Sequence, residues 1–427
     1  MNEKLDIREY FEREKENILK DLSELIAIKS RSVDRPECEK ALDLVLEKAR
    51  GMGFSTRLGK YHDVGIAEIG EGDETIGILA HVDVVPEGVI DNWKTDPFEL
   101  SDVGGRLTGR GVVDDKGPVI ISLYAMKYLM ECGVPLKKRI MLIVGTMEEI
   151  IWKDMEHFKE EFPLPDHGYS PDGLFPIYNR ENGFIDTELI FYEEGLTGTE
   201  NISGGTASNS IPSFASCMMD GVLNEYEGKN AHSSAPFTGI NAIALMCEDL
   251  AESKDYGFLR FMAEYFPEKA YSSNISFTKK DGTAAGKDDL TMVPTMIRQE
   301  GKKVIININT RESYEIGTDQ ILEKLSELSR VWGYDINIIE ALEPIQVEED
   351  LPWMLRMKKV LKDYGISPEC RPAGGCTYAK TIPNTVCFGP VFDDDHDCAH
   401  QDNEGQSIKN YLRSGEIYTA YLLREMR

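Results

Sequence analysis

An imidazole and a carboxylate, His81 and Asp83, follow a short apolar segment of the chain. This segment, 75–80, holds apolar, small and β-branched residues between acidic clusters, a pattern typical of a buried strand. Open α/β sheets build their sites where such strands end. Residues two apart in an extended chain lie on the same side, so Asp83 can approach the His81 ring. A carboxylate in that position fixes the tautomer of a metal-binding histidine, although a single His-x-Asp is a weak signal.

Further acidic and imidazole side chains follow predicted strands or enter loops, namely Asp114, Glu148, Glu149, Asp172 and His400. Carboxylates with neutral imidazoles and no thiolate suit Zn²⁺, Mn²⁺ or Co²⁺. Two cations a few ångströms apart need a bridging anion, and a carboxylate is the usual one. Only one of the adjacent glutamates is needed as a ligand. The other could therefore take a proton from water, which is the pairing that makes a hydrolase.

The composition excludes several classes of function. The chain has 427 residues, of which 41% are hydrophobic, and a formal charge of −28, which argues against nucleic acid or an anionic membrane as a partner. No segment approaches the roughly 18 apolar residues of a membrane span, and the amino terminus lacks an apolar signal segment. The eight cysteines are scattered without a Cys-x-x-Cys pair. We therefore expect reduced thiols in a soluble, cytoplasmic protein.

The predicted elements indicate an α/β fold with an insertion. The first part is expected to hold helices over 8–29 and 41–49, strands over 64–69 and 75–80, an irregular stretch over 86–110, a helix ending at Met130 and a strand over 139–146. After residue 183 the pattern changes to strands (187–192, 213–220) mixed with helices (240–251, 320–331). From 344 the first pattern resumes, with a helix over 353–361 and a strand over 384–388. The order of elements predicts an α/β sheet, 1–183 and 344–427, interrupted by an α+β insert, 184–343.

Motifs in fixed order across nearly the whole chain resemble those of the M20 family of co-catalytic metallopeptidases, and most closely its dipeptidase (PepV-like) branch. They include His81-Val-Asp-Val-Val-Pro-Glu-Gly88 and Gly109-Arg-Gly-Val-Val-Asp-Asp-Lys-Gly-Pro118. The others lie at 148–149 with 152–153, 170–176, 204–212, 228–236, 374–379 and 399–404. Each motif alone is moderately specific, whereas the ordered set is strongly so.

The resemblance implies a mixed-sheet, zinc-peptidase-like catalytic domain with an inserted α+β lid domain. It implies one cation on His81 and Asp172, a second on Glu149 and His400, and Asp114 bridging the two. Zn²⁺ is the first candidate for both cations, with Mn²⁺ and Co²⁺ as alternatives. Glu148 is implied as general base and then acid, Asp83 as the group that orients His81, and the peptide between Asp114 and Asp115 as cis.

The resemblance also implies residues that hold the substrate. In the lid, His232 would stabilise the oxyanion, and Asn209 and Arg311 would bind the substrate, Arg311 through its carboxylate. Gly374 and Gly375 would let the backbone approach the substrate closely. The chain departs from the family pattern at Cys376, where glycine is frequent, and at Lys380, where arginine is common, and both differences concern substrate preference. The remaining histidines His62, His157 and His167 are expected at the surface or in loops.

We expect a dinuclear metal-dependent hydrolase that cleaves the amide bond of small peptides, with dipeptides that have a free amino terminus as the first substrate class. Two alternatives remain open. The same site could serve an N-acyl amino acid deacylase or a carboxypeptidase of this family, or the chain could be a catalytically silent binding scaffold. The expected partner is a small peptide substrate, without nucleic acid or membrane, and both a monomer and a homodimer are compatible with the sequence.

Overall fold

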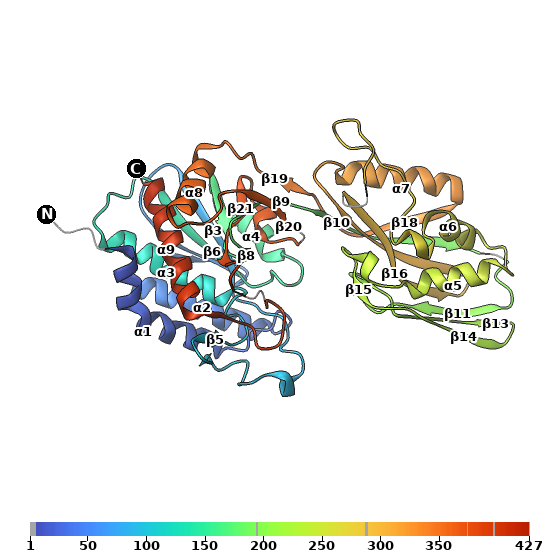
Figure 1. Ribbon diagram of the computed structural model, residues 1–427, viewed down its shortest axis with the longest axis horizontal. Helices are drawn as coiled ribbons and strands as arrows, with labels where there is room; N and C mark the ends of the chain where they lie inside the picture. The colour runs from blue at the N-terminus through green and yellow to red at the C-terminus, as the bar shows by residue number, and fades with distance from the viewer. Residues whose placement is uncertain (1–5, 194, 287–288, 374, 396–397, 427) are drawn as a thin grey trace. The chain divides into compact units, whose positions relative to one another are not determined.

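The computed structural model describes residues 6–193, 195–286, 289–373, 375–395 and 398–426 (Figure 1). Its contacts divide the chain into two compact units, with divisions between 179 and 180 and between 346 and 347. The predicted insert, 184–343, lies inside the second unit. Within the described ranges, no helix combines the length and the apolar character that a membrane span requires.

A mixed sheet forms the centre of the first unit. Its strands lie in the order β1 (Ser55–Leu58), β2 (Val64–Ile69), β6 (Arg139–Gly145), β3 (Thr75–His81), β7 (His167–Ser170), β21 (Thr385–Cys387), β9 (Ile177–Glu181) and β19 (Ile345–Gln346), and β20 (Cys370–Ala373) pairs with β9. β3 runs parallel to β6 and β7, whereas β2 is antiparallel to β6. Because β3 is buried along its whole length, its apolar residues can pack on both faces while it delivers His81 at its end.

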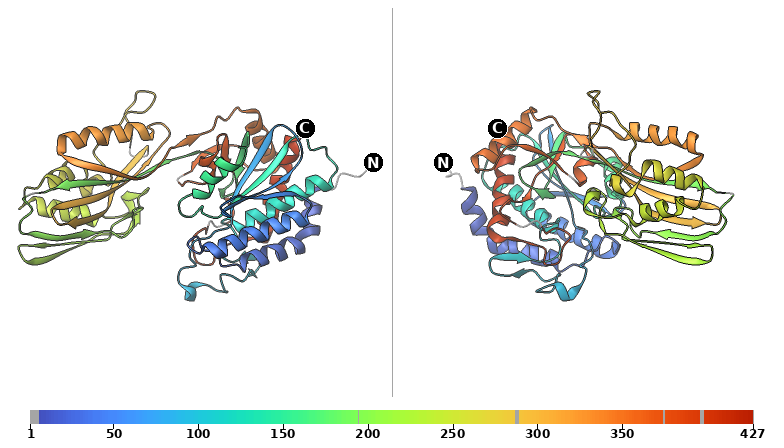
Figure 2. Two further views of the ribbon diagram at one scale, coloured as in Figure 1. Left: turned by 180° about the vertical axis from the view of Figure 1, so that it is seen from behind. Right: turned by 45° about the vertical axis from the view of Figure 1, so that its right-hand side comes forward.

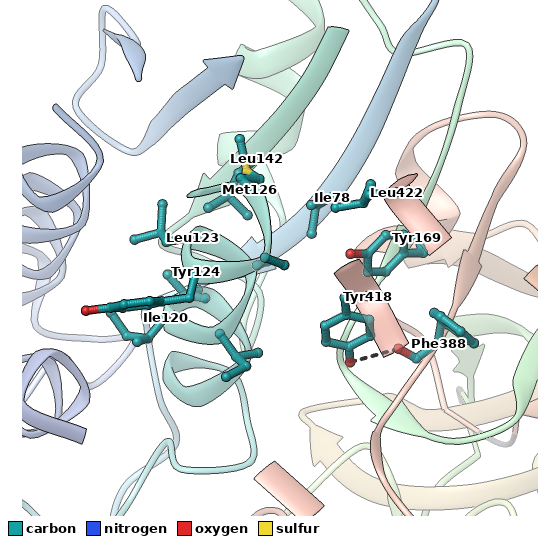
Figure 3. Packing of buried hydrophobic residues seen from close by; sticks show 14 of the residues in the cluster. Ile78, Ile120, Leu123, Tyr124, Met126, Leu142, Tyr169, Phe388, Tyr418 and Leu422 are labelled. Atoms are coloured by element: carbon teal, nitrogen blue, oxygen red, sulfur yellow. Dashed lines mark hydrogen bonds between the residues drawn. The ribbon is translucent and has the colours of Figure 1, made fainter. Parts of the chain in front are cut away.

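Helices cover both faces of this sheet. One apolar core contains Ile78 and Leu142 together with residues of α1 (Ile7–Ile26), α2 (Arg35–Gly51), α3 (Lys116–Glu131), α8 (Pro352–Asp363) and α9 (Ile408–Glu425). Figure 3 shows Leu142 of β6 beside Met126 of α3 in this core. A second core joins Leu79 and Ile143 to α4 (Lys153–Glu161) and η4 (Tyr378–Thr381). Successive side chains of a strand point to opposite faces, so Ile78 and Leu79 enter different cores.

An aromatic cluster joins the sheet to α9 (Figure 3). Tyr169 of β7 stacks on Tyr418 of α9 with ring centroids 5.2 Å apart, and Phe388 lies 5.9 Å from Tyr418. The Tyr418 hydroxyl donates a hydrogen bond to the carbonyl oxygen of Phe388 at 3.0 Å. All three rings are buried, so the cluster anchors the last helix to the strands that carry functional loops.

An antiparallel sheet forms the centre of the second unit. Its strands lie in the order β14 (Val222–Glu227), β13 (Phe214–Met219), β11 (Thr199–Gly204), β16 (Leu290–Glu300), β17 (Lys303–Glu312), β10 (Gly183–Tyr192) and β18 (Tyr334–Leu342). The helices α5 (Ala242–Ala251), α6 (Gly257–Tyr265) and α7 (Thr318–Trp332) share its apolar core (Figure 2). A separate short pair, β12 (Ser210–Ile211) and β15 (Ala231–His232), carries His232. The second unit is therefore an α+β unit.

The predicted helices and strands are confirmed, with ends that differ by a few residues. Two predictions are wrong. The stretch 86–110 contains η1 (Ile90–Asn92), β4 (Ser101–Asp102) and β5 (Arg106–Thr108), and β5 pairs with β23 (Gly405–Ser407). His167, expected at the surface, is a buried residue of β7 whose ring stacks on Trp353, with centroids 5.0 Å apart.

The aromatic cluster predicts two different losses of stability at Tyr418. Tyr418→Phe keeps the ring and leaves the Phe388 carbonyl without its donor, so the free energy of unfolding should fall by about 1 kcal/mol. Tyr418→Ala removes the ring and should lower it by about 3–5 kcal/mol. Urea denaturation followed by circular dichroism measures both, with Val33→Ala at a position 82% exposed as the control. Equal effects of the two variants would contradict the role of ring packing.

Candidate functional site

One buried carboxylate organises the end of β3. His81 is buried, and its Nδ1 lies 3.2 Å from Oδ1 of Asp83 and 3.0 Å from the Asp83 carbonyl oxygen. The Asp83 carboxylate also accepts hydrogen bonds from the backbone N–H groups of Glu148, at 3.1 Å, and Glu149, at 3.2 Å. Asp83 therefore contacts both the imidazole and the backbone of the glutamate pair. The Nε2 atom of His81 remains available to other side chains.

Asp114 lies between the two histidines. Its Oδ1 is 3.0 Å from Nε2 of His81, and its Oδ2 is 2.9 Å from Nε2 of His400. Asp172 approaches Nε2 of His81 at 3.8 Å, and Glu149 approaches Nε2 of His400 at 3.0 Å. Two groups of three side chains therefore share Asp114, and within each group the candidate ligand atoms lie within 4.8 Å of one another. We call these five residues the cluster.

The cluster has the donor set that divalent cations prefer. The buried atoms Nε2 of His81 and Oδ1 of Asp114 make no directed hydrogen bond within the described chain, and neither does Oε1 of Glu148 beside them. Buried charged groups are costly unless they are paired or coordinate a metal. Imidazole nitrogens and carboxylate oxygens bind Zn²⁺, Mn²⁺ and Co²⁺. The residues therefore fit two divalent cations, with Asp114 placed to contact both.

Negative charge is concentrated around the cluster. Burial, together with the neighbouring Asp172 carboxylate, raises the pKa of Glu148 well above its ordinary value. Burial and the charge of Asp114 raise the pKa of Asp172 in the same way. Hydrogen bonds to Asp114 and Glu149 raise the pKa of His400 to about 11. Protons and divalent cations therefore compete for the same atoms.

Glu404 holds the loop that carries Asp114. This carboxylate is fully buried and accepts hydrogen bonds at 2.9–3.1 Å from the backbone N–H groups of Gly111, Val113 and Asp114. The Asp114–Asp115 peptide is cis, as the resemblance implied. Sequence reasoning missed the role of Glu404, although this residue ends the motif that begins beside His400.

Asp154 and Tyr378 hold the loop that precedes the glutamate pair. The buried Asp154 carboxylate accepts hydrogen bonds from the backbone N–H groups of Thr146, at 2.7 Å, and Met147, at 2.9 Å, and from the Tyr378 hydroxyl. Burial raises the pKa of Asp154 to about 6. The Tyr378 ring also lies edge-on to His81, with centroids 6.0 Å apart. This pair, likewise missed by sequence reasoning, supports the cluster from behind.

The cluster opens into a cleft of about 290 Å³ within the first unit. Asp114, Glu148, Asp172 and His400 are among the residues that line it. Gly375 also lines the cleft, and a Cβ atom there would meet no atom of the described chain within 4 Å, so packing does not require glycine at this position. The other predicted glycine, Gly374, lies outside the described residues. This cleft is at the small end of the range for ligand pockets, about 300–1,000 Å³.

The remaining predicted residues belong to the second unit. His232 is exposed, and its Nδ1 lies 2.7 Å from the Ser234 hydroxyl and accepts the Ser234 backbone N–H at 3.2 Å. Partial burial and the positive charge of Arg311 lower the pKa of His232. The Arg311 guanidinium lies 4.4 Å from the ring centroid of Phe184, and the carbonyl of the exposed Asn209 accepts the Ser233 N–H at 3.0 Å. All three residues therefore lie in the second unit, whereas the cluster belongs to the first.

The hydrogen bonds from the Asp114 loop to Glu404 predict that Glu404→Ala weakens cation binding. The loop amides lose their acceptor, so we expect a 10- to 100-fold loss of Zn²⁺ affinity, the usual cost of removing a group that orients a ligand. Asp114→Ala, which removes the shared ligand itself, should lose both cations. Equilibrium dialysis with elemental analysis measures both, and Glu160→Ala, at an exposed site, is the matched control. If Glu404→Ala binds Zn²⁺ with wild-type affinity, Glu404 does not contribute to cation binding.

Comparisons with known proteins identify the family of this chain. A family model described as peptidase family M20/M25/M40 matches residues 77–424. The chain is 31% identical to the Beta-Ala-Xaa dipeptidase of Lactobacillus delbrueckii subsp. lactis, with 97% of each chain covered.

Solved structures show the same fold at lower identity. Human carnosine dipeptidase 1 has a TM-score of 0.64 at 18% identity, with 98% of each chain covered. The YXEP protein of Bacillus subtilis, a dinuclear metal-binding peptidase, has a TM-score of 0.58 at 11% identity, again with 98% of each chain covered. The fold class expected from the sequence is confirmed by these likenesses. Because the family model spans most of its length, this chain belongs to peptidase family M20/M25/M40.

Proposed function

We propose that this M20 peptidase hydrolyses the amide bond of dipeptides with a free amino terminus, and that it does so with two divalent cations. The observation that carries the proposal is the position of Asp114 between two His/carboxylate groups, with Glu148 beside them. Similarity to the Beta-Ala-Xaa dipeptidase supports a small peptide substrate. Zn²⁺ is the first candidate for both cations, Mn²⁺ and Co²⁺ are the alternatives, and a reducing cytoplasm is the proposed location.

In this reaction the five residues of the cluster would hold the two cations, and Glu148 would move the protons. When bound, the two cations supply Lewis acidity that activates water and polarises the scissile carbonyl. Glu148 belongs to neither group of three and takes the proton of the attacking water. Once the tetrahedral carbon has formed, Glu148 returns the proton to the leaving amine.

The second unit supplies the groups that hold the substrate in this proposal. Since Nδ1 of His232 accepts the Ser234 N–H, the proton of the neutral ring is on Nε2. His232 can then donate that N–H to the oxyanion. The lowered pKa of His232 favours this neutral form at neutral pH. Arg311 would bind the substrate carboxylate and Asn209 the substrate backbone.

A substrate panel tests the proposed reaction. Protein loaded with Zn²⁺ or, separately, with Mn²⁺ should cleave unblocked dipeptides at least about tenfold faster than their N-acetylated forms, because the cleft has to accept a free amine. Release of amino acids is measured by chromatography. Faster cleavage of the N-acetylated forms would instead indicate a deacylase or a carboxypeptidase, and a protein that retains no cation and cleaves nothing would indicate a binding scaffold.

Glu148→Ala tests the base. The variant should retain both cations, since Glu148 is not among the proposed ligands, and its turnover should fall by roughly two to four orders of magnitude, the usual contribution of general acid–base catalysis. Elemental analysis and kcat with a single dipeptide provide the two measurements. Glu149→Ala is the matched variant, and it should lose cation as well as turnover. If the turnover of Glu148→Ala is close to that of the wild type, another residue is the general base.

A further inference from the structure

We propose that the cleft selects substrates whose amino-terminal residue has an uncharged, apolar side chain. This inference rests on the proposed dipeptidase function and adds the substrate class. The cleft has two chemically different parts. Among the lining residues that the structure describes, the charged or metal-ligating side chains are Asp114, Glu148, Asp172 and His400, which belong to the cluster or, for Glu148, stand next to one of its members in the sequence, and we call this part the reacting end.

In the other part of the cleft, the register of paired strands brings uncharged side chains next to one another, and we call this part the apolar wall. β8 (Gly173–Leu174) runs parallel to β22 (Pro390–Val391), which places Leu174 next to Val391. β21 and β9 are antiparallel, which places Cys387 next to Tyr178. Residues opposite each other on neighbouring strands have side chains on the same face. These four side chains all line the cleft and form its wall.

Cys376 and Ala373 complete the wall. Both are half-buried and line the cleft, Ala373 from the end of β20 and Cys376 from the segment that follows it. The Cys376 side chain takes space in the cleft that a glycine would leave to the ligand. The Lys380 ammonium lies 3.6 Å from the Cys376 sulfur but does not line the cleft. Cys376 is therefore a specificity-determining residue in this inference.

The reaction decides which side chain of a dipeptide meets the wall. The scissile carbonyl belongs to the amino-terminal residue, so that residue has to reach the cluster at the reacting end. Its side chain branches from the carbon next to the carbonyl and enters the same cleft. A charged side chain would lose hydration against the wall and meet no opposite charge among the described wall residues. Each methylene group buried there should instead raise kcat/KM by about fourfold.

Dipeptides that differ only in the first residue test this preference. For the wild-type protein, kcat/KM should rise from Ala-Ala to Leu-Ala, and Lys-Ala and Asp-Ala should be at least about tenfold poorer than Leu-Ala. The reversed peptides Ala-Leu and Ala-Lys show whether the preference belongs to the first residue. Equal values for Leu-Ala and Lys-Ala, or a preference confined to the second residue, would overturn the inference.

Variants of the wall locate the preference. Cys376→Asp places a carboxylate on the wall and should lower the ratio of kcat/KM for Leu-Ala over Lys-Ala by about tenfold. Cys132→Asp makes the same substitution at a half-buried position outside the cleft and should keep the wild-type ratio. Leu174→Ala, which only shortens a side chain, should lower the ratio of Leu-Ala over Ala-Ala by about tenfold. Unchanged ratios in both wall variants would overturn the inference.

A binding measurement separates failure of this inference from failure of the proposed function. Calorimetric titration of the Glu148→Ala protein, which does not depend on turnover, should show leucinamide binding at least about tenfold tighter than lysinamide. If the wild-type protein cleaves dipeptides but Glu148→Ala binds the two amides equally, only the proposed selectivity of the wall is overturned. Absence of any dipeptide cleavage by the cation-loaded wild-type protein would overturn the proposed function and, with it, this inference.

Discussion

The hydrogen bonds received by the Asp83 carboxylate are the constraint on which the cluster depends. Asp83 is fully buried and faces the Nδ1 atom of His81 and the amides of Glu148 and Glu149. A buried carboxylate is stable only with such partners, and its partners are fixed in turn. Because β3 and β6 are parallel neighbours, with His81 beside Gly145, one side chain can reach both strand ends. The sheet thus determines the tautomer of the histidine and the path of the glutamate loop together.

The other residues of the site depend on similar support from outside their own segments. Asp114 is held by Glu404, and the loop of Glu148 is held by Asp154 and Tyr378. His400 has a backbone φ of 62°, a conformation that few residues other than glycine adopt. Strain of this kind persists where the surroundings enforce it, and here the pairing of β5 with β23 fixes the chain just after His400.

Sequence patterns predicted the cluster better than they predicted what supports it. His81 and Asp114 stand inside motifs whose order along the chain is itself informative. Glu404 also ends one of these motifs, but the motif does not reveal its role, because the pairing of β5 with β23 decides which carboxylate receives three loop amides. This pairing joins segments that no local pattern connects. Similarly, the polar neighbours of His167 suggested exposure, whereas packing on Trp353 buries it.

The same reasoning explains what was predicted in the second unit. Alternation and helical periodicity were enough to assign the insert as α+β, and the structure shows that arrangement. The β16–β17 hairpin was not anticipated as the centre of its sheet, because asparagines alternate with isoleucines in β17 and lower the apparent strand signal. Asn307 is nevertheless buried and donates a hydrogen bond to Asp186 at 2.7 Å. Such hydrogen bonds between buried polar groups can be identified only when the pairing register of the strands is known.

The hydrogen bond from the Asp114 N–H to Glu404 joins residues that are 290 positions apart in the sequence. This separation has a consequence for biosynthesis. A ribosome that adds about 5–20 residues per second needs roughly 15–60 s to pass from one partner to the other. Throughout that interval the nascent Asp114 loop has neither its acceptor nor the second histidine. The whole second unit is translated in the meantime. The second group of the cluster, which contains His400, is thus completed only late in synthesis, and until then the polypeptide has no fully assembled centre.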